Sequence, residues 1–441
     1  MYIGSVKTSQ PQMKYTFYLV LLFLSIKISA QQIIERDIHS DHLEEVRVLK
    51  IYIPKDYDKS KTKHPLAIVL DSELLFDTYV SLSELFAKKN KVPAQIVVGI
   101  SQEIDVFRQR DYGFNILNSY PTTNSMNTFE FIKSEVLTHM KENFRIANFK
   151  TIVGNELTAN FNNYFFIEDK PLFNAYLNLN PHFAPDMPEY IMSKASRLKG
   201  DDYFYYMSSA SNTSKKANKT ISDVNKRLQN VKNLYFNYQY DIHTVSKTFS
   251  IPISISNALN NIYTMYSSIN QHEFDTNISF LSPEAAIEYL LYKYENIEYS
   301  FGEKMAIRKE DFIAIESIII DKEKGKMLES FGELALENFP KDPLGNYYIG
   351  LFHENKGNYH EALLEYKRGF GKIPSSSPRS SGFFTNIKRV ISLQKIEKAR
   401  RDAPEANDNL DSETSNEENY EENNNTKKDT ISNEVPSLNV N

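Results

Sequence analysis

The chain has 441 residues, a formal net charge of −6 and a pI of about 5.9. An acidic chain of this kind does not carry the basic footprint of nucleic-acid binders, so we expect no nucleic-acid partner. It contains no cysteine, which excludes disulfides, thiol nucleophiles and cysteine-bound zinc. The length allows two domains, and 28 Tyr and 28 Phe provide enough apolar surface for a substantial core.

The N-terminal 30 residues have the pattern of a secretory signal peptide. Lys14 precedes an apolar run from Tyr15 to Ile26, which is shorter than the roughly 18–20 residues needed to span a bilayer. Small residues before Ala30 suit cleavage after it, and Met13 is an alternative start. We therefore predict export to the periplasm or the exterior, with no membrane contact other than through this segment. An uncleaved membrane anchor is the alternative.

Residues 31–275 alternate strand-like and helical patterns. This alternation predicts an α/β fold with a mostly parallel sheet and helices on both faces. The strand-like runs are rich in β-branched or aromatic residues, and they cover 46–53, 65–70, 95–100, 151–154, 172–179, 203–207 and 234–240. Helical spacing is predicted over 82–89, 127–144, from 159 onward, 221–228 and 252–266.

One stretch has the shape of a catalytic turn. In Thr151–Asn160 (TIVGNELTAN) an apolar strand ends at Gly154 and a helix begins shortly afterwards. In a hydrolase with the G-x-S-x-G pattern, a serine nucleophile lies on such a sharp strand-to-helix turn. Here the serine position holds Glu156, and Thr158 stands where the second glycine would be.

Seven segments in order resemble the putative esterase family of α/β hydrolases, which includes esterase D-like and enterochelin-esterase-like proteins. The similarity spans roughly residues 31–270. The segments are RVLKIYIPKDYD (47–58), LAIVLDSELLF (66–76), IVVGIS (96–101), RQRDYGF (108–114), TIVGNELTAN (151–160), KPLFNAYLNLNP (170–181) and DIHTVS (241–246).

The resemblance assigns roles to individual residues. It implies that His243 is the catalytic histidine and that Glu156 stands at the nucleophile position. It implies that Leu157, Asp71, Ser72 and Glu73 line the pocket around the oxyanion hole. It also implies that a loop near the pocket mouth carries Arg110, Asp111 and Tyr112. A simple turn-capping role for the residues of the 71–73 turn is an equal alternative.

The departures from the family pattern predict a loss of catalysis. Glu156 cannot act as an alkoxide-like nucleophile, and the segment 208–212, where the acid usually lies, contains no carboxylate. We therefore expect a degenerate, non-catalytic site that binds a small ester-like ligand or a protein. Two alternatives stay open: a serine esterase that uses another serine, for which Ser72 and Ser209 are the candidates, and a hydrolase with Glu156 as a carboxylate nucleophile and His243 as its partner.

Glu156 also has a structural interpretation. A carboxylate at the start of a helix is favoured by the exposed N–H groups and the helix dipole, by roughly 0.3–1 kcal/mol. We expect Glu156 to form an ion pair with His243. The His39-Ser40-Asp41-His42 run lacks a third ligand, so we predict neither a metal site nor a cofactor.

Residues 283–400 predict an all-helical domain. The segment 342–374 resembles a tetratricopeptide repeat, with small, aromatic and terminating residues at the repeat's positions, and Pro340 precedes Pro374 by the 34-residue repeat length. A repeat surface could bind a protein partner; a purely structural appendage is the alternative. From 401 to 441 the chain is acidic and Asn-rich, which predicts disorder.

Overall fold

A computed structural model describes residues 32–101, 105–374 and 379–402. The predicted signal peptide (1–30) and the predicted disordered tail, apart from its first two residues, lie outside this part of the chain. Within the described ranges, no helix combines the length and the apolar character needed to span a bilayer.

The chain divides into two compact units. The first extends to Ser268 and also includes Lys293–Met305, and the second contains Ile269–Tyr292 and the residues from Ala306 onward. Helix α11 (Pro283–Phe301) therefore begins in the second unit and ends in the first.

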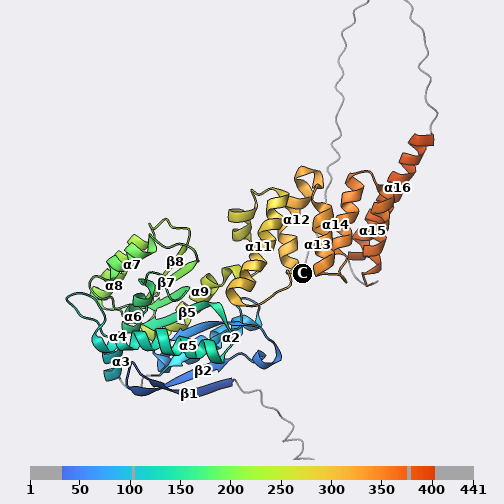
Figure 1. Ribbon diagram of the computed structural model, residues 1–441. Helices are drawn as coiled ribbons and strands as arrows, with labels where there is room; N and C mark the ends of the chain where they lie inside the picture. The colour runs from blue at the N-terminus through green and yellow to red at the C-terminus, as the bar shows by residue number, and fades with distance from the viewer. Residues whose placement is uncertain (1–31, 102–104, 375–378, 403–441) are drawn as a thin grey trace, which may run out of the picture. The chain divides into compact units, whose positions relative to one another are not determined.

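The first unit is built on one eight-stranded sheet (Figure 1) with the order β1-β2-β4-β3-β5-β6-β7-β8. β1 pairs antiparallel with β2, β2 pairs antiparallel with β4, and all other neighbours are parallel. The strands are β1 Gln32–Ser40, β2 Glu45–Ile53, β3 His64–Val69, β4 Ile96–Ile100, β5 Ile146–Asn155, β6 Ala175–Leu179, β7 Tyr203–Ser209 and β8 Phe236–Ile242. The mostly parallel sheet is confirmed.

Helices cover both faces of this sheet, as predicted. Their bounds are η1 Tyr57–Lys59, α2 Ser72–Lys88, α3 Asp105–Tyr112, α4 Thr123–Glu130, η2 Phe131–Val136, α5 Leu137–Asn143, α6 Leu157–Phe166, α7 Met187–Ala195, α8 Lys215–Leu228, α9 Lys247–Ile262 and η3 Thr264–Tyr266. On one face Phe166 of α6 packs on Tyr176 of β6, with ring centroids 5.1 Å apart. On the other, Tyr263 at the end of α9 packs on Phe149 of β5 at 5.6 Å.

The central strands are apolar along their whole length because both faces are covered. Every residue from Leu66 to Leu70 is fully buried, and so are Ile96, Val97 and Val98 of β4. Alternation of apolar and polar residues is therefore absent in β3 and β4, and the continuous runs at 65–70 and 95–100 predicted these strands correctly.

Several boundaries differ from the sequence prediction. β1 was not predicted, because its alternating apolar and charged residues also suit a loop; it is an edge strand, for which such charges are usual. α2 begins ten residues before the predicted helix at 82–89. The segment with Arg110 is helix α3 rather than a loop, and His243 directly follows strand β8. α9 begins at Lys247, with Pro252 inside it.

Gly154 allows the start of α6 to lie against the end of β5. A Cβ atom there would lie 2.6 Å from the Thr158 carbonyl carbon and 2.8 Å from the Ala159 nitrogen, and both are backbone atoms that cannot rotate away. We predict that Gly154→Ala lowers the free energy of unfolding by about 1–3 kcal/mol through overpacking. Gly371→Ala is the comparison, because a Cβ there meets nothing within 4 Å and its backbone is helical, without a positive φ. Urea denaturation of both variants checks this, and an equal loss in both would contradict a steric origin.

The end of α11 belongs to the core of the first unit. Phe301 is buried and contacts the rings of Phe149, Tyr263 and Tyr266 at centroid distances of 5.3, 5.3 and 6.0 Å. The Asn148 side chain donates a hydrogen bond to the Tyr299 carbonyl at 2.9 Å. The first unit therefore includes the segment 293–305 as an integral part.

The second unit is helical in its described part, as predicted. Its elements are α10 Gln271–Glu273, η4 Phe274–Ile278, the first half of α11, α12 Lys309–Asp321, η5 Glu323–Gly325, α13 Leu328–Asn338, α14 Leu344–Asn355, α15 Tyr359–Gly371 and α16 Arg379–Asp402. α14 and α15 form a helix pair in which Gly350 lies against the Tyr366 ring and Gly357 has φ 77° in the turn. Tyr366 donates a hydrogen bond to Glu354 at 2.8 Å, and Arg389 of α16 binds the same carboxylate.

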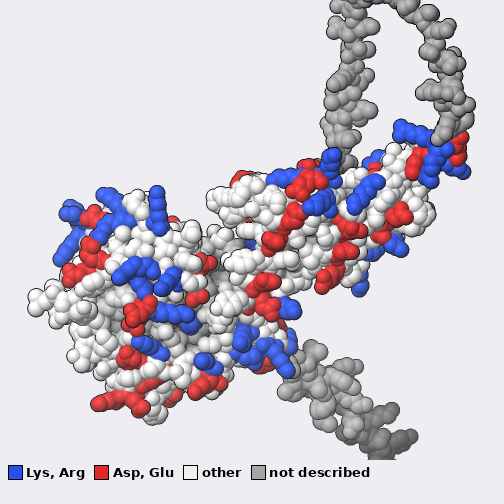
Figure 2. All heavy atoms as spheres, turned by 45° about the horizontal axis from the view of Figure 1, so that its top comes forward, with Lys and Arg blue, Asp and Glu red and all other residues white. Residues whose placement is uncertain are grey.

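Acidic and basic side chains are interspersed over the face drawn in Figure 2. No large area of one charge sign is visible on that face of either unit. An extended polyanion would find alternating attraction and repulsion there.

Candidate functional site

The site is centred on the turn between β5 and α6, which we call the elbow (Gly154–Thr158). Glu156 has φ 53° and ψ −103°, a conformation that side chains other than glycine rarely adopt. Such a residue carries strain of order 1–3 kcal/mol and persists only where its surroundings hold it. The Glu156 N–H donates to the Leu179 carbonyl at 2.8 Å, and its carbonyl accepts from the His182 N–H at 3.0 Å. The sharp strand-to-helix turn of a nucleophile elbow is therefore present with glutamate in it.

The carboxylate of Glu156 is held by two cations. Lys247, the first residue of α9, donates to Oε1, and the Arg108 guanidinium lies 3.9 Å from Oε2. The side chains of Glu156 and Lys247 are about one-third exposed, at 34% and 29%. The predicted pair between Glu156 and His243 is not what the structure shows, because Lys247 takes the position of the partner.

A second ion pair lies at the elbow, between the partly buried Arg108 and the buried Asp71. Arg108 donates from Nε to Asp71 Oδ1 at 2.6 Å and from Nη2 to Oδ2 at 3.1 Å, a bidentate pair. The same Nη2 donates to the Asn155 carbonyl at 2.7 Å. Burial lowers the pKa of Arg108, but its bonds to Asp71 and the nearby Glu156 outweigh burial and leave that pKa raised. Arg108 is therefore a fixed cation that ties α3 to the elbow.

Thr158 joins the elbow to the start of α2. Its hydroxyl donates to Asp71 Oδ2 at 2.6 Å and accepts from the Asn155 N–H at 2.7 Å. Asp71 is in the left-handed conformation, with φ 52° and ψ 48°, directly before Ser72. The second glycine of the hydrolase pattern is thus replaced by a side chain that fixes the turn.

The predicted oxyanion residues lie at two helix starts. Leu157 opens α6 and Ser72 opens α2, and both side chains are buried, whereas Glu73 is exposed. The Thr158–Asp71 hydrogen bond brings these two helix N-termini together, and the first N–H groups of a helix have no partner within it. The arrangement can bind an anion, and in this chain Glu156 supplies one at the same turn.

The residues expected at the pocket mouth mostly serve to attach α3. Asp111 is buried and accepts hydrogen bonds from Arg47 of β2 at 2.5 Å and from Arg110 at 2.6 Å. Arg110 also binds Glu45 at 2.9 Å. Tyr112 is fully buried and its ring packs edge-on to Phe161 of α6 at 4.9 Å. Asp111 and Tyr112 therefore have no exposed surface to offer a ligand.

His243 is turned toward a serine on α9. Its Nε2 lies 2.8 Å from the Ser254 hydroxyl, which in turn donates to Ser208 at 3.0 Å. His243 is 9% exposed and both serines are fully buried. Ser208 lies at the end of β7, where the resemblance places the acid, so a hydroxyl chain occupies that region.

The candidate serines of the active alternative lie elsewhere. Ser209 shares a hydrogen bond with the Tyr240 hydroxyl at 2.7 Å, and Ser72 Oγ points at Gly99, where it would lie 2.4 Å from an added Cβ. The histidine run at 39–42 is not a metal site in the structure's described part: the His42 Nε2 forms a hydrogen bond with the Ser134 hydroxyl at 3.1 Å. Among the described residues, no group of three or more acidic or histidine side chains is placed to hold a metal ion.

Three residues of the site were not singled out from the sequence. Lys247 lies 91 positions from Glu156, and no local pattern marks it. Arg108 and Arg110 lie two residues apart in the segment 108–114, and the sequence does not reveal which of them faces the elbow. Ser254 is one of several serines in α9, and only its hydrogen bond with His243 distinguishes it.

Comparisons with known proteins support the fold. No family model and no curated protein matches the chain. It is similar to the crystal structure of an uncharacterised protein from Capnocytophaga ochracea, with 23% identity and a TM-score of 0.68, over 82% of this chain and 100% of that one. It is also similar to an IroE-like serine hydrolase from Shewanella oneidensis, with 18% identity and a TM-score of 0.50, over 69% of this chain and 98% of that one.

These likenesses and the sheet define the fold. The first unit has the α/β-hydrolase fold of esterase-like proteins, with a strand-to-helix elbow at the carboxyl end of β5. At 18% and 23% identity, the likeness concerns the fold alone. What the site does depends on its own side chains.

Proposed function

We propose that this protein is an exported, non-catalytic relative of esterase-like hydrolases that binds a small ester-like ligand or a protein. The observation that carries the proposal is the ion pair between Glu156 and Lys247 at the elbow. A glutamate at the nucleophile position, already neutralised by a lysine, replaces the serine that ester hydrolysis requires.

The position of His243 supports the same proposal. A base must lie within hydrogen-bonding reach of the nucleophile that it activates. The His243 Nε2 instead bonds to Ser254, a fully buried helical residue that a substrate cannot reach. Loss of a triad nucleophile lowers turnover by on the order of 10⁶, and the oxyanion hole and substrate binding alone supply the remainder.

Hydrolysis of short-chain p-nitrophenyl esters tests the proposal. We expect the mature protein to release p-nitrophenol no faster than its His243→Ala variant. We expect Glu156→Ser to recover little activity, because the base faces Ser254 and lacks a supporting carboxylate. Turnover by the natural protein that His243→Ala abolishes would overturn the proposal.

The carboxylate-nucleophile alternative has one supporting observation, the strained backbone of Glu156. The Lys247 ammonium lowers the nucleophilicity of that carboxylate, which weakens this alternative. Incubation with an epoxide followed by intact-mass measurement separates the two. A covalent adduct that Glu156→Gln prevents would favour the alternative over the binding function.

Three helices that contribute to the hydrogen-bond network at the elbow each carry an exposed apolar side chain, which would suit a ligand with an apolar part. Leu74 on α2 is 46% exposed, Phe107 on α3 is 38% exposed and Phe249 on α9 is 72% exposed. Each of these helices also contributes to the network at the elbow through Asp71, Arg108 or Lys247.

The helical unit is the other candidate surface, for a protein partner. Its repeat-like helix pair α14–α15 supports this role. Removal of the residues after Met305 tests it, because the first unit includes residues up to that position. Export itself rests on the N-terminal sequence pattern, and detection of the protein in a periplasmic or culture fraction tests it.

A further inference from the structure

A second pocket lies in the first unit, at the opposite end of the strands from the elbow. It has a volume of about 360 Å³, which is enough for a small molecule. His64 lies at the beginning of β3 and Gln95 directly before β4. The elbow follows the end of β5, which runs parallel to β3. With ~3.3 Å per residue along a strand, the two sites are roughly 20 Å apart.

Two buried side-chain nitrogen atoms among the residues that line this pocket have no hydrogen-bond partner within the described part of the chain. They are the Nε2 of His64 and the Nε2 of Gln95, in side chains 8% and 2% exposed. The Gln95 Oε1 accepts from the Tyr79 hydroxyl at 2.9 Å, so the amide NH₂ is left as a donor. A buried polar atom without a partner is unfavourable, so a ligand group that bonds to it would be favoured.

His64 is prepared to accept a hydrogen bond. Its Nδ1 lies 2.9 Å from the Ala94 carbonyl, which can only accept, so Nδ1 carries the proton. Burial lowers the pKa of His64, so the ring is neutral near pH 7. A neutral ring with its proton on Nδ1 has a lone pair on Nε2. Two side chains that line the pocket therefore have one donor without a hydrogen-bond partner, on Gln95, and one acceptor, on His64, just below its surface.

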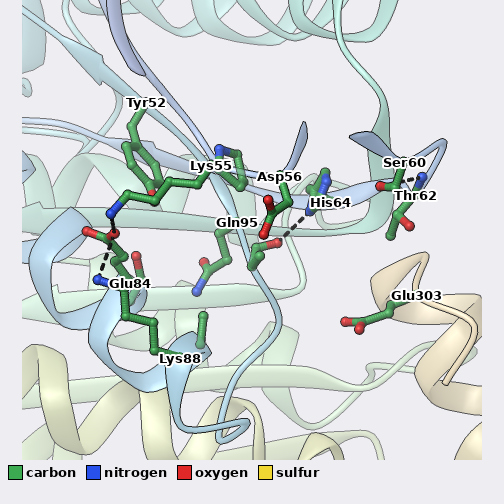
Figure 3. A pocket seen from close by; sticks show the side chains of 14 residues that line it. Tyr52, Lys55, Asp56, Ser60, Thr62, His64, Glu84, Lys88, Gln95 and Glu303 are labelled. Atoms are coloured by element: carbon green, nitrogen blue, oxygen red, sulfur yellow. Dashed lines mark hydrogen bonds and ion pairs between the residues drawn. The ribbon is translucent and has the colours of Figure 1, made fainter. Parts of the chain in front are cut away.

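The charged residues of the pocket are separated by sign. Figure 3 shows Lys55, Lys88 and Glu84 on one side of Gln95, and Asp56 and Glu303 on the other side. Lys55 and Lys88 share one Glu84 oxygen, at 3.1 and 3.0 Å, so that side carries two ammonium groups for one carboxylate. On the other side, Asp56 is paired with Lys59 at 2.7 Å, whereas Glu303 accepts a hydrogen bond from the neutral Tyr266 hydroxyl at 2.9 Å, so that side keeps one negative charge without a cation among these contacts.

We propose that this pocket binds a dipeptide with free termini. Its carboxylate would lie near Lys55 and Lys88, and its ammonium group near Asp56 and Glu303. The peptide bond between them offers one acceptor and one donor, which match the Gln95 amide and the His64 ring. A purely anionic or purely cationic ligand would meet repulsion at one side of the pocket.

Titration calorimetry with the dipeptide alanyl-alanine tests the proposal on the full mature protein. We expect measurable binding, and at least about tenfold weaker binding of N-acetyl-alanyl-alanine amide, which lacks both charges. Lys88→Gln and Glu303→Gln should each weaken binding by a similar factor. Lys88 is 58% exposed, so its variant is expected to fold. Gln95→Leu should lower the affinity for alanyl-alanine, but the ratio of the affinities for the free and the blocked peptide should stay the same.

Two controls locate the binding. Lys133→Gln removes a surface ion pair with Glu168 and should leave the affinity unchanged. Glu156→Gln changes the elbow and should also leave it unchanged, which separates this proposal from the proposed function. The proposal is overturned if alanyl-alanine gives no binding heat at millimolar concentrations, if the blocked peptide binds equally well, or if only Glu156→Gln weakens the binding.

Discussion

Replacement of Arg108 with alanine is expected to lower the free energy of unfolding of the first unit by about 2–3 kcal/mol, less than for a fully buried ion pair because the Arg108 side chain is 24% exposed. The Asp71 carboxylate is 7% exposed and accepts both of its charge-assisted bonds from Arg108. Without the guanidinium, the Asp71 carboxylate would keep the hydrogen bond from the neutral Thr158 hydroxyl but would lose its cation. Hydrogen exchange of peptides that cover 151–166 measures the loss in the first unit itself.

Two further variants identify the cause of that loss. Arg227→Ala breaks an exposed pair with Glu189, at 40% and 66% exposure, and should cost no more than about 1 kcal/mol. The double variant Arg108→Ala/Asp71→Asn should be more stable than Arg108→Ala alone, because it removes the unpaired charge. A double variant as unstable as the single one would show that packing, not charge, makes Arg108 important.

Phe161→Ala is expected to have a larger effect, about 3–5 kcal/mol, for a different reason. Phe161 is fully buried on α6, and its ring contacts Tyr112 at 4.9 Å and Phe165 at 5.5 Å, both edge-on. Truncation leaves a cavity between α6 and α3, the helix that carries Arg108. Urea denaturation of the mature protein, followed by circular dichroism, measures the change.

Two control variants test this reason: one changes the side-chain volume at position 161, and the other removes an exposed phenylalanine elsewhere. Phe161→Leu keeps most of the apolar volume and should cost clearly less than the alanine variant. Phe249→Ala removes a ring that is 72% exposed and should change stability by no more than about 0.5 kcal/mol. If Phe161→Ala and Phe249→Ala had equal effects, the contact between α6 and α3 would not be the reason.

The sequence predicted the sheet well because its inner strands are buried on both faces. The continuous apolar runs of β3 and β4 have few alternative structures. β1 escaped prediction because its charged residues alternate with apolar ones at the edge of the sheet. The start of α2 was missed because Asp71 and Ser72 suit a turn, and Asp71 does take a left-handed turn conformation immediately before the helix. Pro252 suggested the beginning of a helix, whereas α9 begins five residues earlier.

The elbow was predictable and its ion pairs were not. A glycine after an apolar strand, followed by a helical pattern, marks the turn locally at Gly154. The partner of Glu156 depends on how α9 lies after the sheet has formed, and this brings in Lys247 instead of His243. A resemblance transfers the position of His243 in the chain, but its hydrogen bond to Ser254 depends on where α9 lies after the sheet has formed.

The course of α11 has a consequence for how the protein is made. A ribosome synthesises Ile269–Tyr292, which belong to the second unit, before it reaches Phe301. Phe149 and Tyr263 therefore lack one of their ring partners until this part of the second unit has been translated. The N-terminal unit of a chain ordinarily completes its fold first during synthesis. Here the first unit can complete its core only after Ile269–Tyr292 of the second unit have been synthesised, and a chain that stops before Pro283 would leave those two rings without Phe301.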